Sequence, residues 1–171
     1  MAIYSNGGNF THKAQEAIIM AQDLARERGQ QQIDALHLLF ALLNQEGSVV
    51  LTLLHKMGAD VEGLRRRTER ALSRLGSVIN PQALGQFYLT QDMARVLERA
   101  RQEAMKMGDE FISVEHLFLA LLDTPTKAKE ILDSTSFVQQ EGGVAELGFG
   151  KLSYEEALKA LSKIRGGARI T

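Results

Sequence analysis

The sequence predicts an all-α fold of two similar halves, each with about four helices, packed with approximate two-fold symmetry as one globular double domain. Apolar residues recur at spacings of three and four, the period of a helix, rather than in the alternation of a strand. Only two prolines interrupt the 171 residues. The chain also matches itself when it is shifted by 79 residues, which indicates a duplicated helical bundle.

The internal repeat is clearest where residues 11–43 align without a gap on residues 90–122. Ten of these 33 aligned positions are identical, among them His37 with His116. The stretch Gly76–Leu89 contains Asn-Pro and has weak periodicity, so it is predicted to connect the halves. We therefore divide the chain into a first repeat, a second repeat and the start of a linker, at residues 1–79, 80–167 and 168–171.

The first half is predicted to hold an amphipathic helix followed by three more. Thr11 is placed to cap the first helix and Gly29 to end it, while Asp60 is placed to cap the fourth. The second helix is apolar nearly all round, so we expect it at the centre of the bundle. The three later helices are predicted at Ile33–Asn44, Val49–Met57 and Val61–Leu75.

The second half repeats this pattern with an insertion. Its closing helix aligns with that of the first half at a spacing of 89 rather than 79, which places ten additional residues in Ser134–Gly150. The four glycines of that stretch predict a long mobile loop. Pro125 is expected in the first turn of the third helix, and Ser153 with Glu156 forms a capping box before the fourth. These two helices are predicted at Ala128–Asp133 and Ala157–Ile164.

The composition argues against a partner that is recognised through charge or through a membrane. Twenty Lys and Arg residues face 21 Asp and Glu residues, and the formal net charge of −1 gathers neither nucleic acid nor an anionic membrane. The sequence has no cysteine. The polar start, Met1–Phe10, lacks the apolar core of a signal peptide, and the longest apolar run is Leu38–Leu43. We expect a cytoplasmic protein with no nucleic-acid or membrane partner.

No motif for catalysis, nucleotide binding or metal binding is found in the sequence. Gly150-Lys151 lacks both the earlier glycine and the following Ser or Thr of a phosphate-binding loop. The four histidines do not pair at the spacing of metal ligands. His37 and His116, at equivalent positions of the two central helices, are predicted to be hydrogen-bonded packing residues. We therefore expect no enzyme, no catalytic or metal site and no cofactor in this chain.

Two charged segments have structural interpretations. The arginines between residues 65 and 74 alternate with Glu69 and have no aromatic neighbour for base stacking, so they are predicted to form a solvated helix face. In the turn before the second repeat's second helix, either Ser113 or Asp109 is placed to cap that helix. Glu115, in the first turn, suits the helix dipole.

At these residues the sequence resembles the Clp N-terminal repeat domain, the doubled module at the head of ClpA, ClpC and ClpB unfoldases. The resemblance extends from Phe10 to Gly167, and its ending favours the ClpB type. Its recognisable segments are Phe10-Thr11, Ile33–Leu43, Phe111–Leu122 and Ile164–Gly167.

The resemblance implies the substrate-binding N-terminal domain of a ClpB-type ATP-dependent protein disaggregase. Such a domain engages unfolded or aggregated polypeptides and passes them to a hexameric AAA+ ATPase. ATP and magnesium would then belong to AAA+ domains beyond this chain, and a DnaK-type chaperone system would act through those regions as well. The full-length parent would be an ATPase, while this domain makes and breaks no bond.

The resemblance also implies which residues bind the substrate: Thr11, Asp109 and Glu115. We expect them to form a polar rim beside a shallow apolar groove. Arg99 and Glu103 stand on helix faces where apolar groove residues are wanted, which is a departure from that picture.

Two alternatives remain open. One is an adaptor-binding or phosphoarginine-degron-binding domain of a ClpC/ClpA-type protease regulatory subunit, where a Thr and a helix-start Glu in each repeat bind phosphorylated arginine. Read within each repeat, this chain has Thr90 with Glu115, but Thr11 with Leu36, so only the second repeat keeps the pattern. The other alternative is a free-standing interaction protein.

Overall fold

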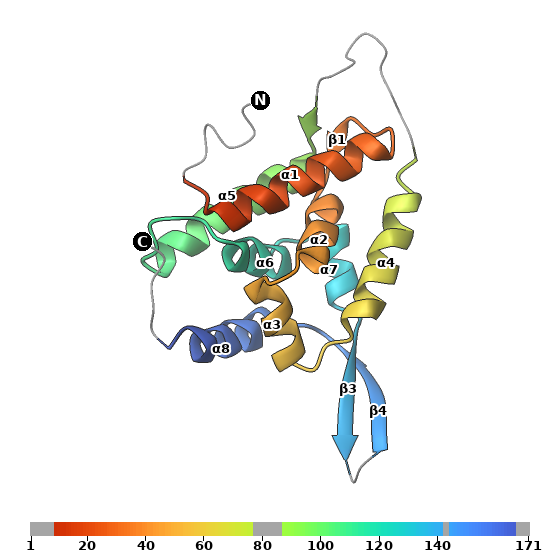
Figure 1. Cartoon of the computed structure of the whole chain (residues 1–171), viewed down its shortest axis with the longest axis vertical. Coiled ribbons are helices and arrows are strands. Elements are labelled where there is room, and N and C mark those ends of the chain that lie inside the picture. The colour runs from red at the N-terminus through yellow and green to blue at the C-terminus, as the bar shows by residue number, and fades with distance from the viewer. Residues whose placement is uncertain (1–8, 77–86, 142–143, 167–171) are drawn as a thin grey trace.

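The computed structural model describes residues 9–76, 87–141 and 144–166, which form eight helices and four strands (Figure 1). Four helices precede the connector and four follow it, as predicted. The helices are α1 His12–Glu27, α2 Ala35–Asn44, α3 Val49–Lys56, α4 Val61–Ser73, α5 Gln91–Lys106, α6 Val114–Asp123, α7 Lys127–Leu132 and α8 Tyr154–Arg165. The strands are β1 Gln32–Ile33, β2 Tyr88–Leu89, β3 Thr135–Glu141 and β4 Val144–Gly150.

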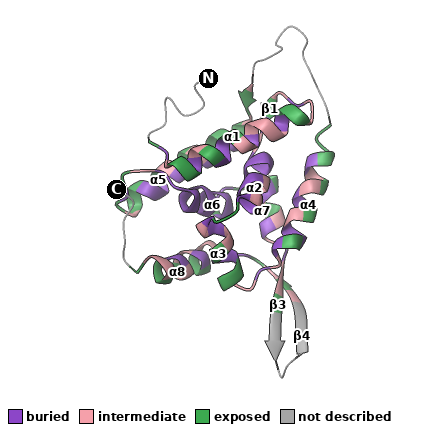
Figure 2. Cartoon of the chain, in the orientation of Figure 1, coloured by how far each residue is buried: buried purple, intermediate pink, exposed green. Residues whose placement is uncertain are grey.

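Helices α2 and α6 form the centre of the molecule because they are apolar around most of their circumference. Eight of the ten residues of α2 and nine of the ten of α6 are buried (Figure 2). Helix α1 packs on α2, α5 packs on α6, and α2 also contacts α6. The two halves therefore share one hydrophobic core, as the repeat predicts.

Capping residues set the helix starts at the predicted places. Thr11 Oγ1 accepts a hydrogen bond from the Ala14 N–H at 3.2 Å, and Asp60 Oδ1 accepts one from the Gly63 N–H at 3.1 Å. Each bond satisfies a backbone donor that has no partner within the helix. After α1, Gly29 has a φ of +69°, the left-handed conformation that favours glycine at a helix end.

Short parallel pairings interlock the two halves. Strand β1 pairs with β2, and Phe10 forms an isolated parallel bridge with Ile112. The Thr11 N–H donates to the Ile112 carbonyl at 2.9 Å, and the Thr90 N–H donates to the Ile33 carbonyl at 3.1 Å. The chain before the first helix of each half thus lies against the turn before the second helix of the other half.

The prediction of a mobile loop at Ser134–Gly150 is wrong, because β3 and β4 form an antiparallel hairpin there. Its register runs from Thr135 opposite Gly150 to Glu141 opposite Val144. The glycine count concealed an alternation at the start of β3, where Thr135 is buried and Phe137 packs against the core, whereas Val138 is exposed. This alternation with a period of two is the pattern of a strand with one covered face.

Other details also differ from the predictions. Helix α7 begins at Lys127 with Thr126 as its N-cap, so Pro125 precedes the cap and is not in the first turn. Helix α8 begins three residues earlier than predicted, after Ser153, whose side chain accepts from the Glu156 N–H at 3.0 Å. Most of the predicted connector, residues 77–86, lies outside the described residues.

The arginine-rich face of α4 is only partly solvated. Arg65 Nε donates to the Leu43 carbonyl at 2.8 Å, and the Arg67 guanidinium donates to the carbonyls of Ile131 and Ser134. These two side chains therefore hold α4 against α2 and against the end of α7. The predicted solvated face remains correct for the exposed arginines: Arg66, Arg70 and Arg74.

Candidate functional site

Two pockets lie where the halves interlock, and each combines the N-cap threonine of one half with the second-helix start of the other. The Thr11 pocket has a volume of about 400 Å³, and the Thr90 pocket about 490 Å³. Residues lining the Thr11 pocket are Thr11, His12, Lys13, Gly47, Ser48, Val49, Ser113, Val114 and Glu115. Those lining the Thr90 pocket are Gln30, Gln31, Gln32, Asp34, Leu75, Gly76, Tyr88, Thr90, Asp92 and Lys127.

Three helix starts converge on the Thr11 pocket. Thr11, Ser48 and Ser113 are the N-caps of α1, α3 and α6. The first N–H groups of a helix point out of its end, and the helix dipole makes that end partly positive. Together with Lys13, these starts offer donors to oxygen acceptors, and Glu115 adds a carboxylate to a pocket whose lining surface is mostly apolar.

The predicted partners of the threonines were grouped wrongly. Reading each repeat alone placed Thr90 with Glu115 and Thr11 with Leu36. The structure instead brings Thr11 to the same pocket as Glu115, and it brings Thr90 to Asp34, because the segments before α1 and α5 cross to the opposite half. The chain therefore keeps one Thr–Glu combination, at the Thr11 pocket.

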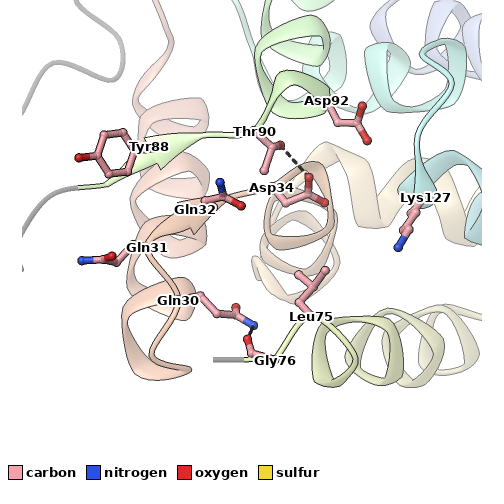
Figure 3. A pocket seen from close by; sticks show the side chains of 10 residues that line it. All are labelled: Gln30, Gln31, Gln32, Asp34, Leu75, Gly76, Tyr88, Thr90, Asp92 and Lys127. Atoms are coloured by element: carbon pink, nitrogen blue, oxygen red, sulfur yellow. Dashed lines mark hydrogen bonds between the residues drawn. The ribbon is translucent and has the colours of Figure 1, made fainter. Parts of the chain in front are cut away.

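The Thr90 pocket differs in its chemistry. Thr90 Oγ1 donates to Asp34 Oδ1 at 2.7 Å, and Figure 3 shows these side chains pointing toward one another. Asp34 Oδ2 also accepts from the Leu36 N–H at 3.1 Å, so this carboxylate serves as the cap of α2. Leu36, which aligns with Glu115, is fully buried in the core. The Thr90 pocket thus has a capping aspartate where the Thr11 pocket has a glutamate.

Asp109 and Glu115 do not form the open polar rim that we expected, because both pair with one arginine. Arg165 Nη2 lies 2.9 Å from Asp109 Oδ2, and Arg165 Nε lies 3.3 Å from Glu115 Oε2. Only 9% of the Arg165 side chain and 8% of the Glu115 side chain are exposed. We call Asp109, Glu115, His116 and Arg165 the Arg165 cluster. It fastens the last residue of α8 to the turn before α6.

The sequence analysis missed the Arg165 cluster, because an arginine at the end of a helix carries no local signal of which acids it will pair with. Its guanidinium fits two carboxylates that arrive from a turn and from the start of α6, some 50 residues earlier in the chain. The sequence did show that Asp109 and Glu115 lie near each other in the chain. A helix-end cation near two buried acids would have been the remaining clue, since buried acids need partners.

The two central histidines are hydrogen-bonded packing residues, as predicted. His37 Nδ1 accepts from the Asp34 N–H at 2.9 Å, and its Nε2 lies 2.7 Å from Gln30 Oε1. His116 Nδ1 accepts from the Ser113 N–H at 2.8 Å, and its Nε2 lies 2.6 Å from a carboxylate oxygen of Asp109. Both rings are therefore neutral with the proton on Nε2.

Burial keeps the histidine rings neutral. It lowers the pKa of His37 from 6.5 to about 4, although the charge of Asp34 opposes the shift. Burial likewise lowers the pKa of His116, against the raising effect of the Asp109 hydrogen bond. Of the two residues predicted as alternatives for capping α6, Ser113 is the N-cap, and the Asp109 carboxylate instead accepts from His116.

The face of α5 on which we expected apolar groove residues carries charged side chains instead. Arg99 Nη1 lies 2.7 Å from Glu103 Oε2, and Glu103 is buried. The Tyr154 hydroxyl donates to the other oxygen of Glu103, and the Arg99 guanidinium stands over the Tyr154 ring at 5.7 Å. These contacts tie the start of α8 to α5. A shallow apolar groove on this face of α5 is therefore not part of the described structure.

The described residues contain no cluster of three or more His, Asp or Glu side chains suited to hold a metal ion. Among the same residues, no single helix is long and apolar enough to cross a membrane. Helices α2 and α3 taken together have the length and apolar composition of a membrane span, but the pair is bent by 82°.

Two interlocked four-helix repeats with a pocket at each junction define a class of protein, the double-repeat helical binding domain. Residues 9–135 match the family model of the Clp repeat (R) N-terminal domain. The chain belongs to this family.

The sequence is similar to those of ClpB chaperones. The chain is 33% identical over 164 residues to the chaperone protein ClpB of Bacillus anthracis and 36% identical over 165 residues to that of Nitratidesulfovibrio vulgaris. These matches cover 94% and 96% of this chain but only 17% and 18% of the two relatives, so the chain spans less than a fifth of their length.

Solved structures of N-terminal domains share the fold. The Hsp104 N-terminal domain from Candida albicans superposes with a TM-score of 0.73 at 22% identity and covers 95% of each chain. The N-terminal domain of the ClpV1 ATPase from E. coli superposes with a TM-score of 0.68 at 19% identity, over 91% of this chain and 85% of that one. This chain thus shares its fold with the Hsp104 and ClpV1 N-terminal domains.

Proposed function

We propose that this chain is the substrate-binding N-terminal domain of a cytoplasmic ClpB-type ATP-dependent disaggregase. It would hold unfolded or aggregated polypeptides for threading by the AAA+ hexamer of its parent chain. ATP and magnesium would bind in AAA+ domains outside this chain, and a DnaK-type system would act through those regions too. The observation that carries the proposal is the Thr11 pocket, which brings Thr11 and Glu115 together in a domain that is similar in sequence to the N-terminal parts of ClpB chaperones.

The three proposed substrate residues have different roles in this arrangement. Thr11 and Glu115 line the Thr11 pocket, where a client backbone would meet helix-start N–H groups and a carboxylate. Asp109 does not line it. Its carboxylate holds Arg165, which in turn holds Glu115, so we assign Asp109 as a positioning residue. The pocket is open and most of its lining surface is apolar, which favours weak and rapidly reversible binding.

The test is an NMR titration of the 171-residue chain with a permanently unfolded, non-phosphorylated polypeptide. We expect saturable shifts at Thr11, Ser48 and Glu115, which Thr11→Ala and Glu115→Ala weaken severalfold. Asp109→Ala should weaken binding while also shifting the Arg165 side-chain resonances, which marks a positioning role. Thr90→Ala is the matched control, since it removes the equivalent cap hydroxyl at the other pocket. Absence of saturable shifts at the Thr11 pocket would refute the proposal.

A second candidate is a phosphoarginine-degron or adaptor-binding domain of a ClpC/ClpA-type protease subunit. The observation that favours it is the joint presence of three helix starts and Glu115, since a phosphate suits the former and a guanidinium the latter. Against it, the guanidinium of Arg165 already occupies Glu115. A peptide containing phosphoarginine, titrated beside its unmodified form, separates the two candidates: binding of the modified peptide alone favours the protease subunit.

A further inference from the structure

No residue of the β3–β4 hairpin lines the Thr11 pocket or the Thr90 pocket. The hairpin projects away from the helices (Figure 1). The base of β3 is fixed by the loop between α3 and α4. The Asp60 N–H donates to the Ser136 carbonyl at 2.8 Å, and the Val138 N–H donates to the Gly58 carbonyl at 2.8 Å. Phe137 packs against the hydrophobic core on the covered face. The hairpin is therefore a built element with one edge of β3 already paired.

These two hydrogen bonds show which backbone groups point outward from β4. In an antiparallel ladder, pairs of residues that bond to each other alternate with pairs whose N–H and C=O groups point away from each other. Ser136 and Val138 bond to the α3–α4 loop, so their backbone groups point away from β4. Phe149 lies directly opposite Ser136. Its N–H and C=O groups therefore point away from β3, toward the outer edge of β4.

That outer edge is unpaired and apolar at Phe149. Within the described part of the chain, no backbone hydrogen bond outside the hairpin ladder involves Phe149. Phe149 is 78% exposed, the largest fraction among the large apolar residues described. Val138 lies on the same face of the hairpin, since it is two residues from Ser136, and is 46% exposed. A strand edge and an apolar patch thus coincide.

We propose that the edge of β4 at Phe149 binds an extended apolar segment of an unfolded polypeptide by strand addition. An added strand would pair with the outward N–H and C=O groups of Phe149 and cover the apolar patch. This contact would be separate from the Thr11 pocket, and it rests on the proposed function. Edge pairing between two copies is a poor alternative. The surface that one seven-residue strand from each copy would bury is small compared with the roughly 1,200 Å² that a stable dimer buries.

The test uses the 171-residue chain and a ten-residue peptide of alternating Val and Thr with a lysine at each end. We expect this peptide to raise the hydrogen-exchange protection of the Phe149 amide but not that of Gly148, which pairs with Phe137 inside the ladder. The same peptide N-methylated at every amide should lose the effect, because it can donate along neither edge. A side-chain contact alone would not distinguish the two peptides.

Variants at Phe149 distinguish the loss of edge pairing from a general loss of the hairpin structure. Phe149→Pro removes the outward N–H and the ring but no ladder bond, so the hairpin should persist, and affinity should fall about tenfold. Phe149→Leu keeps the N–H and an apolar side chain and should bind about as well as the parent. Retention of the ladder in Phe149→Pro is checked by protection of the Gly148 amide.

The outcomes are distinct. Peptide shifts confined to the Thr11 pocket, with an unchanged Phe149 amide, would overturn the hairpin proposal and leave the proposed function standing. Binding at neither place would overturn both. Protection of Phe149 that depends on protein concentration, without peptide, would assign the edge to a second copy and also overturn the proposal.

Discussion

His37 shows how a buried ring depends on its protonation state. Its Nδ1 accepts from the Asp34 N–H, so a proton added at Nδ1 would place two donors against each other. Burial, with a smaller contribution from the nearby charge of Arg28, lowers its pKa from 6.5 to about 4 against the opposing charge of Asp34. Between these two values the unfolded chain binds a proton that the folded chain rejects.

The free energy of unfolding of the chain should therefore decrease as the pH is lowered through a defined range. Because the folded pKa of His37 is depressed, its contribution is complete above pH 6.5 and is lost as the pH falls from 6.5 toward 4. The loss attributable to His37 is about 2 to 4 kcal/mol in the free energy of unfolding. Urea unfolding at a series of pH values measures it. His37→Asn should flatten the slope, and the exposed His12→Asn should not; equal slopes in all three proteins would contradict the prediction.

Arg165 is the second residue whose surroundings predict a large effect. Its guanidinium pairs with two carboxylates from different elements, and nearly all of its side chain is buried. Removing one partner of a buried ion pair leaves uncompensated charge. Arg165→Met should therefore lower the free energy of unfolding by about 3 kcal/mol.

The matched control for Arg165 is Arg101→Met, which removes an exposed pair with Glu98 one helical turn away. Surface pairs of this kind contribute less than about 1 kcal/mol. Chemical unfolding of both variants gives the comparison. Similar losses in the two would show that the Arg165 cluster adds nothing beyond a surface contact.

At the scale of elements, the sequence predicted the helices far better than the strands. Helix starts carry local signals, since a cap such as Thr11 or Asp60 binds a backbone N–H three residues away. The hairpin has no such signal, because its covered face depends on Phe137 packing against a core built by distant residues. Glycines in the same stretch supported a loop instead.

The candidate site was predictable only in its parts. Thr11, Asp109 and Glu115 were chosen from a family resemblance, and two of them line one pocket. What brings Thr11 beside Glu115 is the crossing of the segment at Phe10 onto Ile112 of the other half. A two-residue pairing between distant segments leaves no periodic pattern in the sequence, so the grouping of pocket residues could not be read from it.

Considered as a whole molecule, the two repeats are packed around one hydrophobic core. Buried apolar residues from both halves belong to a single core cluster. Helix α2 contacts α5, α6 and α7 of the opposite half, and α3 contacts α6 and α8. Parallel pairings at both junctions add backbone hydrogen bonds between the halves. Each half therefore has apolar surface that is covered only by the other half.

Residues 1–79 and 80–171 should therefore fold only together. Each piece alone would expose the central helix, α2 or α6, whose residues are almost all buried in the intact chain. We expect each separate piece to show little cooperative thermal unfolding by circular dichroism, and an equimolar mixture to regain helicity and one transition. Since a fully buried Leu contributes about 2 kcal/mol, Leu38→Ala in the first piece should abolish the complementation, whereas the exposed Glu62→Ala should not. Independent folding of either piece would mean that the shared core is not what holds the repeats together.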